Sequence, residues 1–290
     1  MIARPPPGAD PLADAYEHCA QLARTHARDQ WLGALYASAS ARGALFALAS
    51  FDYEIRQALG RARDPNLTAI RLAWWREVIA GERQAEAAGN PVALALRAAI
   101  DAYALPQSRL EAMLDARLQA IAPQEDFNHV AFRAFADESE GARLRLASRI
   151  TARGQDLDTA DAQAPAGMAL ALTRLLKELP FKAGSAPTLI PTDVAARHGV
   201  NVADFDARRE DPGVTVACAE LRGLARDELA EAERRLKSSS PAILPAFIPL
   251  APLRLDLDRL DRNADRPLDD VGEVSPLRRQ WAIWRWARTR

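Results

Sequence analysis

The chain contains 290 residues with a hydrophobic share of 49%, which is enough to bury a large core in one or two domains. Its 38 basic and 39 acidic residues give a formal net charge of −1, so neither a basic nucleic-acid-binding domain nor an acidic tail is indicated. Alanine, leucine and arginine dominate while β-branched residues are sparse, a composition that favours helix along nearly the whole chain.

Cysteine usage and hydropathy indicate a cytoplasmic protein. Cys19 and Cys218 are far apart and lack the paired spacing of a zinc site or a disulfide framework, which suits a reducing compartment. No run of 18 apolar residues is present, and Met1–Asp10 lacks the apolar segment of a signal peptide. We expect the proline-rich residues 1–10 to be disordered and residues 11–290 to form a single soluble helical domain, with peripheral attachment at the inner membrane as the alternative location.

Small residues run through the first long helical segment. Residues 32–59 predict one helix whose small side chains let neighbouring helices approach closely, and Asp64-Pro65-Asn66 ends it.

The following segment, residues 67–80, predicts a helix with Ile70, Trp74 and Ile79 on its buried face. Adjacent Trp74 and Trp75 must point about 100° apart on a helix. We therefore expect one of them in the core and the other at an edge or interface.

An acidic segment lies within the helix predicted for residues 127–153. Asp137, Glu138 and Glu140 could in principle assemble a metal site. However, Asp137 and Glu138 diverge on a helix, and neither belongs to a triplet of acids. We therefore favour a solvated helix face over a metal site for this segment.

The clearest pattern lies in residues 168–200. Apolar residues recur mostly at intervals of three and four and form one broad helical face: Leu170, Leu172, Leu175, Leu176 and Leu179. Arg174, Lys177 and Glu178 take the remaining surface. Pro180 ends the helix, and a short loop leads to an extended segment ending at Ile190-Pro191.

Residues 216–270 combine charged and apolar segments. Residues 216–236 predict a charged amphipathic helix. Residues 241–252 are apolar but too few to span a bilayer, and their prolines imply a kinked core helix or an extended segment. The six aspartates of residues 253–270 lack the ligand order of a calcium loop, so we expect surface salt bridges there.

The last segment, residues 276–290, carries five arginines, three tryptophans and no acidic residue. Leu277, Trp281 and Trp284 share one helical face. We favour a final helix docked on the core with its arginines in water. The alternative is a basic surface for anionic lipid or a partner protein, with Trp281, Trp284 and Arg285 as its contacts.

Residues 168–200 resemble the second signature of the squalene/phytoene synthases. Leu189-Ile190-Pro191, Asp193 and Gly199-Val200 fall, without a gap, where that family has Tyr-Leu-Pro, the following Asp and Gly-Val. The segment near Phe51 and the phrase Arg71-Leu-Ala-Trp-Trp-Arg76 resemble two further family blocks. The resemblance implies an all-α, isoprenoid-synthase-type helical bundle around a central cavity.

In that family, the acids of the second signature hold Mg²⁺, and Mg²⁺ holds the diphosphate of a prenyl substrate. The matching positions in this chain carry, in order, Arg174, Lys177, Glu178, Phe181 and Lys182. One acid of three remains, so a divalent cation would meet weaker attraction. The resemblance thus implies a scaffold whose metal site has been lost.

The family's first acidic motif is altered as well. Aligning Phe51 with the family's phenylalanine puts Arg56, Gln57 and Gly60 at the three aspartate positions. Asp52 and Glu54 lie nearby, but residues two apart point about 200° from each other on a helix and cannot hold one ion. We expect them to be solvated or salt-bridged, and we assign no catalytic residue, metal or cofactor to either motif.

The leading functional hypothesis is a non-enzymatic assembly or partner-binding factor, similar to the family branch that contains the mitochondrial complex I assembly factor. The rival is an active head-to-head prenyl diphosphate transferase that uses Mg²⁺ and displaced acids such as Glu178, Asp137 and Glu140. A third hypothesis is a module that keeps an isoprenoid or another lipid in its cavity. No nucleic acid is expected, and the expected cavity or partner contacts are Phe51, Trp74, Trp75, Glu140, Trp281, Trp284 and Arg285.

Overall fold

The computed structural model describes residues 10–61, 65–120, 126–157, 160–181, 188–209 and 211–289. These residues form helices and no strand, as the composition predicts. The helices up to residue 119 are α1 (Pro11–His26), α2 (Arg28–Ala34), α3 (Ala39–Arg61), α4 (Pro65–Ala80), α5 (Gln84–Gly89), α6 (Pro91–Tyr103) and α7 (Gln107–Gln119). Most of the segment predicted to be disordered, residues 1–9, lies outside the described residues.

A middle group of helices follows: α8 (His129–Ala136), the π-helix η1 (Asp137–Gly141), α9 (Ala142–Thr151), α10 (Ala160–Glu178) and the short 3₁₀ helix η2 (Leu179–Phe181). The last group is α11 (Thr192–Arg197), α12 (Val202–Asp206), α13 (Pro212–Leu236), η3 (Pro241–Ile243), α14 (Leu244–Phe247), η4 (Ile248–Leu250), α15 (Leu253–Arg262) and α16 (Pro276–Arg288).

Four helices begin with the same local chemistry, a capping side chain followed by proline. Asp10, Asn90, Asp211 and Ser275 each accept a hydrogen bond from a backbone N–H of the first turn of α1, α6, α13 and α16. Proline follows in each case, where its missing N–H is not needed and its fixed φ suits a helix. The sequence therefore sets these four starting points locally.

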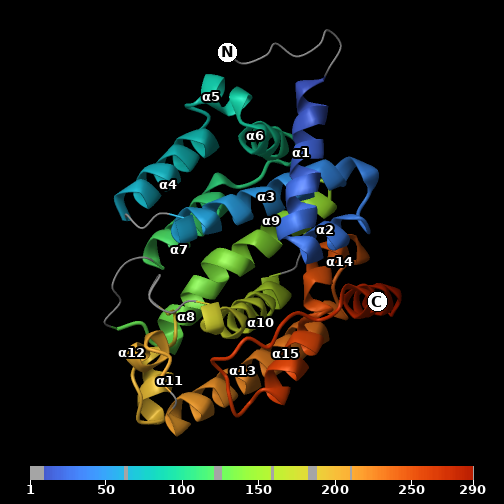
Figure 1. Cartoon of the computed structure of the whole chain (residues 1–290). Coiled ribbons are helices and arrows are strands. Elements are labelled where there is room, and N and C mark those ends of the chain that lie inside the picture. The colour runs from blue at the N-terminus through green and yellow to red at the C-terminus, as the bar shows by residue number, and fades with distance from the viewer. Residues whose placement is uncertain are drawn as a thin grey trace.

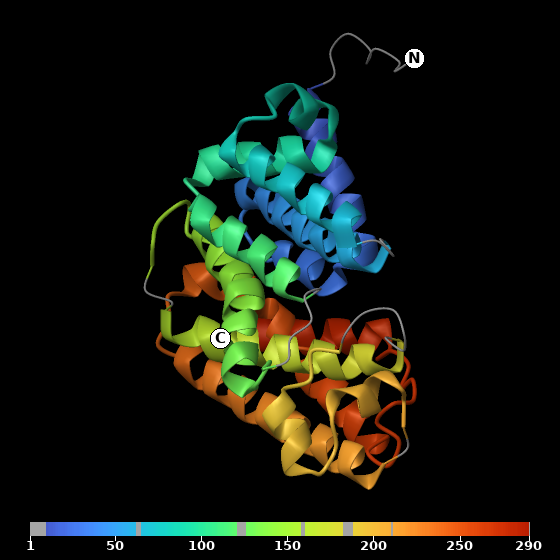
Figure 2. The same ribbon diagram turned by 90° about the vertical axis from the view of Figure 1, so that its left-hand side faces the viewer.

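The helices pack in two groups that meet in the middle of the molecule. α1, α3 and α6 pack on one another, and α10 packs along α13 and α15. α9 contacts α3 and α10, η1 contacts α7 and α10, and α8 packs on η1, α10 and α11. Figure 2 shows most of the first group, coloured blue to cyan, above most of the last group, coloured yellow to red, and Figure 1 shows α9 and α10 between them. α2 joins the two groups directly, since it packs on α14, η4 and α16. Cys19 and Cys218 are both free thiols buried in the packed interior.

The helix predicted for residues 32–59 is divided in two. Backbone N–H groups of Leu35, Tyr36 and Ala37 bond to carbonyls three residues earlier, which tightens the end of α2 before α3 begins at Ala39. The Arg42 side chain donates to the carbonyls of Leu35 (3.1 Å) and Ala37 (3.3 Å). The prediction of a single helix is wrong, and the Arg42 side chain, from the first turn of α3, satisfies backbone acceptors that the break leaves open.

The tryptophan pair of α4 lies as predicted, but Ile70 does not. Trp75 is buried and packs edge-on against Phe51 at 5.0 Å between ring centroids, while Trp74 is half-buried and its indole N–H donates to Glu86 (2.9 Å). Ile70 is 63% exposed, so its predicted burial is wrong. The buried face of α4 is centred on Trp75 and Ile79.

The helix predicted for residues 127–153 is interrupted by η1, a π-helix. A Cβ added to Gly167 of α10 would lie 2.8 Å from the backbone N of Gly141 and 3.1 Å from the carbonyl of Ala136. Only glycine fits this approach of α10 to η1 without displacing backbone atoms. A π-helix widens the helical turn and re-aims the side chains that it carries.

The apolar segment at residues 241–252 adopts the kinked helical alternative. Prolines lie at the first or second position of η3, α14 and η4, and Ile243, Phe247 and Leu250 are buried. Among the described residues, none of the helices combines the length and the apolar character that crossing a bilayer requires.

Candidate functional site

Asp52 on α3 is the first buried carboxylate of the site. It is 1% exposed and lies among the apolar residues of the core. Arg56, one turn further along α3, places Nη2 3.1 Å from its Oδ2, and Arg117 of α7 places Nη2 3.3 Å from its Oδ1. Of the two predicted environments for Asp52, the salt-bridged one is confirmed.

Glu140 on η1 is the second buried carboxylate. It is 1% exposed, and Arg143 donates to its Oε2 from Nη2 (2.9 Å) and Nε (3.1 Å). Arg174 of α10 donates from Nη1 to its other oxygen, Oε1. The predicted solvated face is therefore wrong for Glu140, because the π-helix turns this side chain inward toward α10.

The two ion-paired groups interact electrostatically with each other, so we treat them as one central ion cluster. Its members are Asp52, Arg56, Arg117, Glu140, Arg143 and Arg174. Four guanidinium groups and two carboxylates leave a net charge of +2. Asp52, Arg117, Glu140 and Arg143 are buried, whereas the side chains of Arg56 and Arg174 keep 21% and 24% of their surface exposed. Solvent therefore reaches the cluster on its arginine side.

The cluster keeps both carboxylates ionised. Burial alone would raise the pKa of Glu140, but the positive charges of Arg174 and Arg143 hold that pKa well below its usual range. Burial opposes ionisation of Asp52 in the same way, and Arg56 and Arg117 lower its pKa. Burial and the charge of Arg174 lower the pKa of Arg56 to about 10, so this arginine stays protonated at neutral pH.

The six residues of the central ion cluster do not fit a Mg²⁺ site. Each buried carboxylate faces two guanidinium groups, and the surplus charge is positive, so a divalent cation is repelled. In the part of the chain that the structure describes, no three His, Cys, Asp or Glu side chains gather closely enough to hold a metal ion. Asp137, one of the displaced acids of the sequence analysis, pairs with Arg145 (2.5 Å).

The remaining motif positions lie in several different environments. Lys177 of α10 points to Asp256 of α15, with Nζ 3.3 Å from Oδ1, and Glu178 is half-buried at the end of the same helix. Phe181 is 65% exposed, Gly60 is part of α3, and Lys182 lies outside the described residues. The structure thus brings Arg56 and Arg174 into one cluster and places Lys177 in another.

Gln57 lines a separate pocket on another side of α3. The pocket has a volume of about 570 Å³ and is formed by α1, α3 and α4. Trp74 and Trp75 contribute to its wall, and His26 stacks on Tyr53 at 4.3 Å between ring centroids. The predicted contact residues Trp74 and Trp75 therefore border this pocket, and Phe51 lies behind Trp75 in the core.

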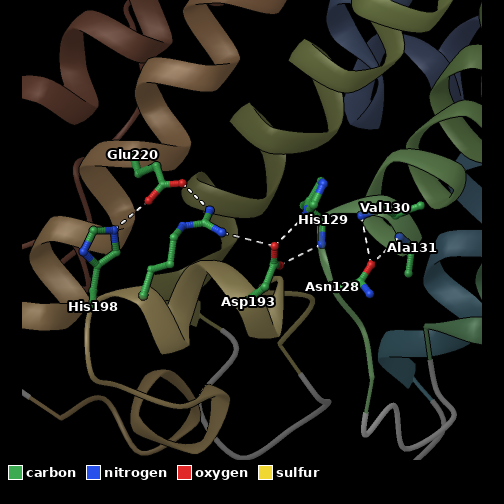
Figure 3. A network of polar contacts seen from close by, with 8 residues as sticks. Asn128, His129, Val130, Ala131, Asp193, His198 and Glu220 are labelled. Atoms are coloured by element: carbon green, nitrogen blue, oxygen red, sulfur yellow. Dashed lines mark hydrogen bonds and ion pairs between the residues drawn. The ribbon is translucent and has the colours of Figure 1, made fainter.

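Asp193, which matches an aspartate of the family signature, ties helices together. It accepts a hydrogen bond from the backbone N–H of His129 (2.8 Å), and its Oδ2 lies 2.5 Å from His129 Nδ1 and 3.2 Å from Arg197 Nη1. Figure 3 shows this network continuing to Glu220 of α13, which also contacts His198 (2.6 Å). Its role in this chain is to join α8, α11 and α13.

The C-terminal helix is docked by a second group of charges. Arg279 of α16 donates to both carboxylate oxygens of Asp256 (2.8 and 2.9 Å) and to Asp29 of α2 (2.9 Å). Burial raises the pKa of Asp29, and the charge of Arg279 partly opposes this. Trp281, Trp284 and Arg285 lie on the exposed side of the same helix.

Sequence reasoning did not single out Arg117 and Arg143. A sequence pattern that could have indicated the buried ion pairs is an acid followed three or four residues later by an arginine within an apolar helix. Asp52 with Arg56 and Glu140 with Arg143 show this pattern. Arg117 carries no such local signal because its partner lies 65 residues away.

Comparison with known proteins shows the family to which this chain belongs. The model of the squalene/phytoene synthase family matches residues 23–285, so the chain belongs to that family, and the predicted resemblance is confirmed. The chain is similar to "NADH dehydrogenase (ubiquinone) complex I, assembly factor 6" of Homo sapiens, with 23% identity over 245 residues that cover 84% of this chain and 73% of the relative. For the Mus musculus protein of the same name, the identity is 22% over 251 residues, or 87% and 75% of the two chains.

Solved structures confirm the predicted fold class. A dehydrosqualene synthase crystallised with a ligand superimposes with a TM-score of 0.79, 13% identity and coverage of 97% of this chain and 98% of that chain. The squalene synthase HpnC from Alicyclobacillus acidocaldarius gives a TM-score of 0.68, 19% identity and coverage of 88% and 96%. At these identities, the similarity establishes the all-helical fold alone.

Proposed function

We propose that this chain is a non-enzymatic member of its family that acts as an assembly or partner-binding factor for a respiratory complex I-type enzyme. The observation that carries the proposal is the pairing of Arg56 and Arg174 with Asp52 and Glu140. Both arginines stand where family motifs that bind Mg²⁺-diphosphate have an acidic or amide residue. The similarity to complex I assembly factor 6, which extends over more than four-fifths of this chain, supports the choice of partner class.

The chemistry of the cluster supports this proposal. A prenyl diphosphate ionises when divalent cations neutralise the leaving group, and the acids that would hold those cations must keep free oxygen lone pairs. Both oxygens of Glu140 accept hydrogen bonds, from Arg143 and Arg174. Asp52 accepts a hydrogen bond from Arg117 on Oδ1, and its Oδ2 lies 3.1 Å from Arg56 in an ion pair without forming a hydrogen bond. A guanidinium group stays protonated and cannot act as a base at neutral pH.

Two measurements test the proposal. The purified protein, incubated with farnesyl or geranylgeranyl diphosphate and Mg²⁺, is expected to release no diphosphate and form no condensed product. Deletion of its gene in the host is expected to lower the amount of assembled complex I on native gels, and the intact gene is expected to restore it. Condensed product, or unchanged complex I after deletion, would contradict the proposal.

The second candidate is an active prenyl transferase that uses displaced acids. The extensive superposition on a dehydrosqualene synthase favours it. It predicts that a prenyl diphosphate raises the unfolding midpoint only when Mg²⁺ is present, because a ligand that binds only the native state stabilises it by mass action. The Glu140→Gln variant should abolish that increase if Glu140 is a metal ligand.

A further inference from the structure

The C-terminal helix α16 is fixed to the protein by one side only. Ile283 and Trp286 are buried against the core, and Arg279 on the same side forms the ion pairs with Asp256 and Asp29. The helix packs on η4 and α2, and it lies at the surface near the C-terminus in Figure 1. Its orientation is therefore set by these three side chains.

The opposite side of α16 presents large apolar residues to solvent. Leu277, Trp281 and Trp284 are 78%, 60% and 40% exposed, and with Arg288 they recur at steps of four, three and four, which is one face of a helix. The two indole rings stack at 4.8 Å between centroids, and Arg288 lies over the Trp284 ring at 4.8 Å. We call Leu277, Trp281, Trp284 and Arg288 the outward face.

Positive charge flanks the outward face. Arg278 and Arg285 are exposed beside it, and α16 contains no acidic residue. Within the described residues, no carboxylate forms an ion pair with Arg278, Arg285 or Arg288, although many other arginines of the protein are paired. The acids closest in sequence, Asp270 and Glu273, precede α16 at its N-terminal end. Arg285 and Arg288, in the C-terminal half of α16, are therefore the arginines farthest from these acids along the chain.

We propose that the outward face of α16 is a docking surface for an anionic lipid bilayer, with the helix axis parallel to the membrane plane. Tryptophan prefers the headgroup level, where its ring is in an apolar layer and its N–H stays hydrated. Unpaired arginines add attraction to anionic headgroups, and a helix with a charged flank and an aromatic face is the usual form of an interfacial anchor. This inference is independent of the proposed function.

A bilayer fits these observations better than a protein groove does. The outward face and its flanks carry Arg278, Arg285 and Arg288 and no carboxylate, so this side of α16 complements a surface of uniform negative charge rather than a mixed one. Tryptophan and leucine side chains need only shallow insertion into a fluid layer, whereas a protein partner would need a matched cavity for each ring.

Vesicle flotation of the full chain tests the proposal. Wild-type protein is expected to float with mixed phosphatidylcholine–phosphatidylglycerol vesicles and to stay behind with pure phosphatidylcholine. R278Q/R285Q/R288Q is expected to lower the partition coefficient about a hundredfold, since each basic residue near an anionic surface contributes about 1 kcal/mol. W281S/W284S is expected to abolish flotation and the blue shift of tryptophan emission that vesicles cause.

Two matched variants control for charge and apolar area. R71Q/R109Q/R262Q removes three exposed arginines from other helices, and I70S/V130S removes two exposed apolar side chains. Both are expected to float like the wild type, and all four variants should keep the wild-type unfolding midpoint because every changed side chain is exposed. Absence of wild-type flotation, or equal loss in R71Q/R109Q/R262Q, would overturn the proposal. So would a concentration-dependent dimer that W281S/W284S dissociates without any vesicle binding, because a second copy would then cover the face.

Discussion

Replacing Glu140 by glutamine removes one of the two carboxylates that pair with four guanidinium groups in the centre of the fold. The net charge of the central ion cluster rises from +2 to +3, and Arg143 loses the only carboxylate that it contacts within the described residues. Breaking a buried ion pair by removing one partner destabilises by about 3–5 kcal/mol. Because the glutamine oxygen still accepts one hydrogen bond, we expect about 3 kcal/mol, which lowers the unfolding midpoint by roughly 6–12 °C in a protein of this size.

Thermal and urea unfolding at neutral pH measure this loss. The matched control is Glu231→Gln. The side chain of Glu231 is 31% exposed, against 2% for Glu140, and it also accepts from two arginines, Arg234 and Arg235, so little shift is expected. The double variant E140Q/R174Q returns the net charge to +2, so it should be more stable than E140Q alone. A wild-type midpoint for E140Q, or a double-variant loss equal to the sum of the two single losses, would refute the electrostatic account.

The pH dependence of the same variant has a defined sign. The native pKa of Glu140 is depressed below its unfolded value, so its contribution is fully present above the usual carboxyl pKa and is lost as the pH falls through that range toward the native pKa. The difference in unfolding free energy between the wild type and E140Q should therefore be constant near neutral pH and shrink on acidification. A difference that grows on acidification would contradict this assignment.

Two further variants test the packing around the cluster and the docking of α16. Gly167→Ala should lower the unfolding free energy by about 1–3 kcal/mol, because its Cβ would overlap backbone of η1, while the control Gly223→Ala in the open interior of α13 should raise it by about 0.5–1 kcal/mol. Urea unfolding midpoints measure both variants. If the two midpoints shift equally, the close approach of α10 to η1 is not the cause of the G167A effect. Asp256→Asn should lower the hydrogen-exchange protection of residues 276–288 more than that of α1, since Arg279 and Lys177 lose their shared carboxylate. Unchanged protection would mean that Ile283 and Trp286 suffice to hold the helix.

Much of the fold could be predicted because its signals are local. Asp-Pro, Asn-Pro and Ser-Pro pairs mark helix starts, apolar periodicity marks α10, and adjacent tryptophans diverge on α4 as helical geometry requires. The missed features depend on side-chain and backbone contacts that helical periodicity does not encode. The break after α2 is stabilised by Arg42, and the burial of Glu140 depends on a π-helical turn held against Gly167 of α10.

The site was predictable in composition but not in arrangement. Aligning the two motifs identified Arg56 and Arg174 as replacements, and read separately each looked like an isolated substitution. The structure shows that they belong to the same cluster, because α3 places Asp52 and η1 places Glu140 within electrostatic range of each other. No spacing rule within one helix encodes that meeting, since it depends on how α7, η1 and α10 pack.

This pairing determines which positive groups balance the two buried carboxylates in the centre of the fold. Where an acidic site must recruit Mg²⁺ to relieve repulsion between its carboxylates, Asp52 and Glu140 are neutralised by guanidinium groups of the chain itself. The native state should therefore gain nothing from divalent cations, and its unfolding midpoint should be the same in EDTA as in Mg²⁺. A midpoint that rises with Mg²⁺ would mean that the metal binds the native state more tightly than the unfolded chain. The proposal that arginines replace Mg²⁺ as the partners of Asp52 and Glu140 would then be wrong.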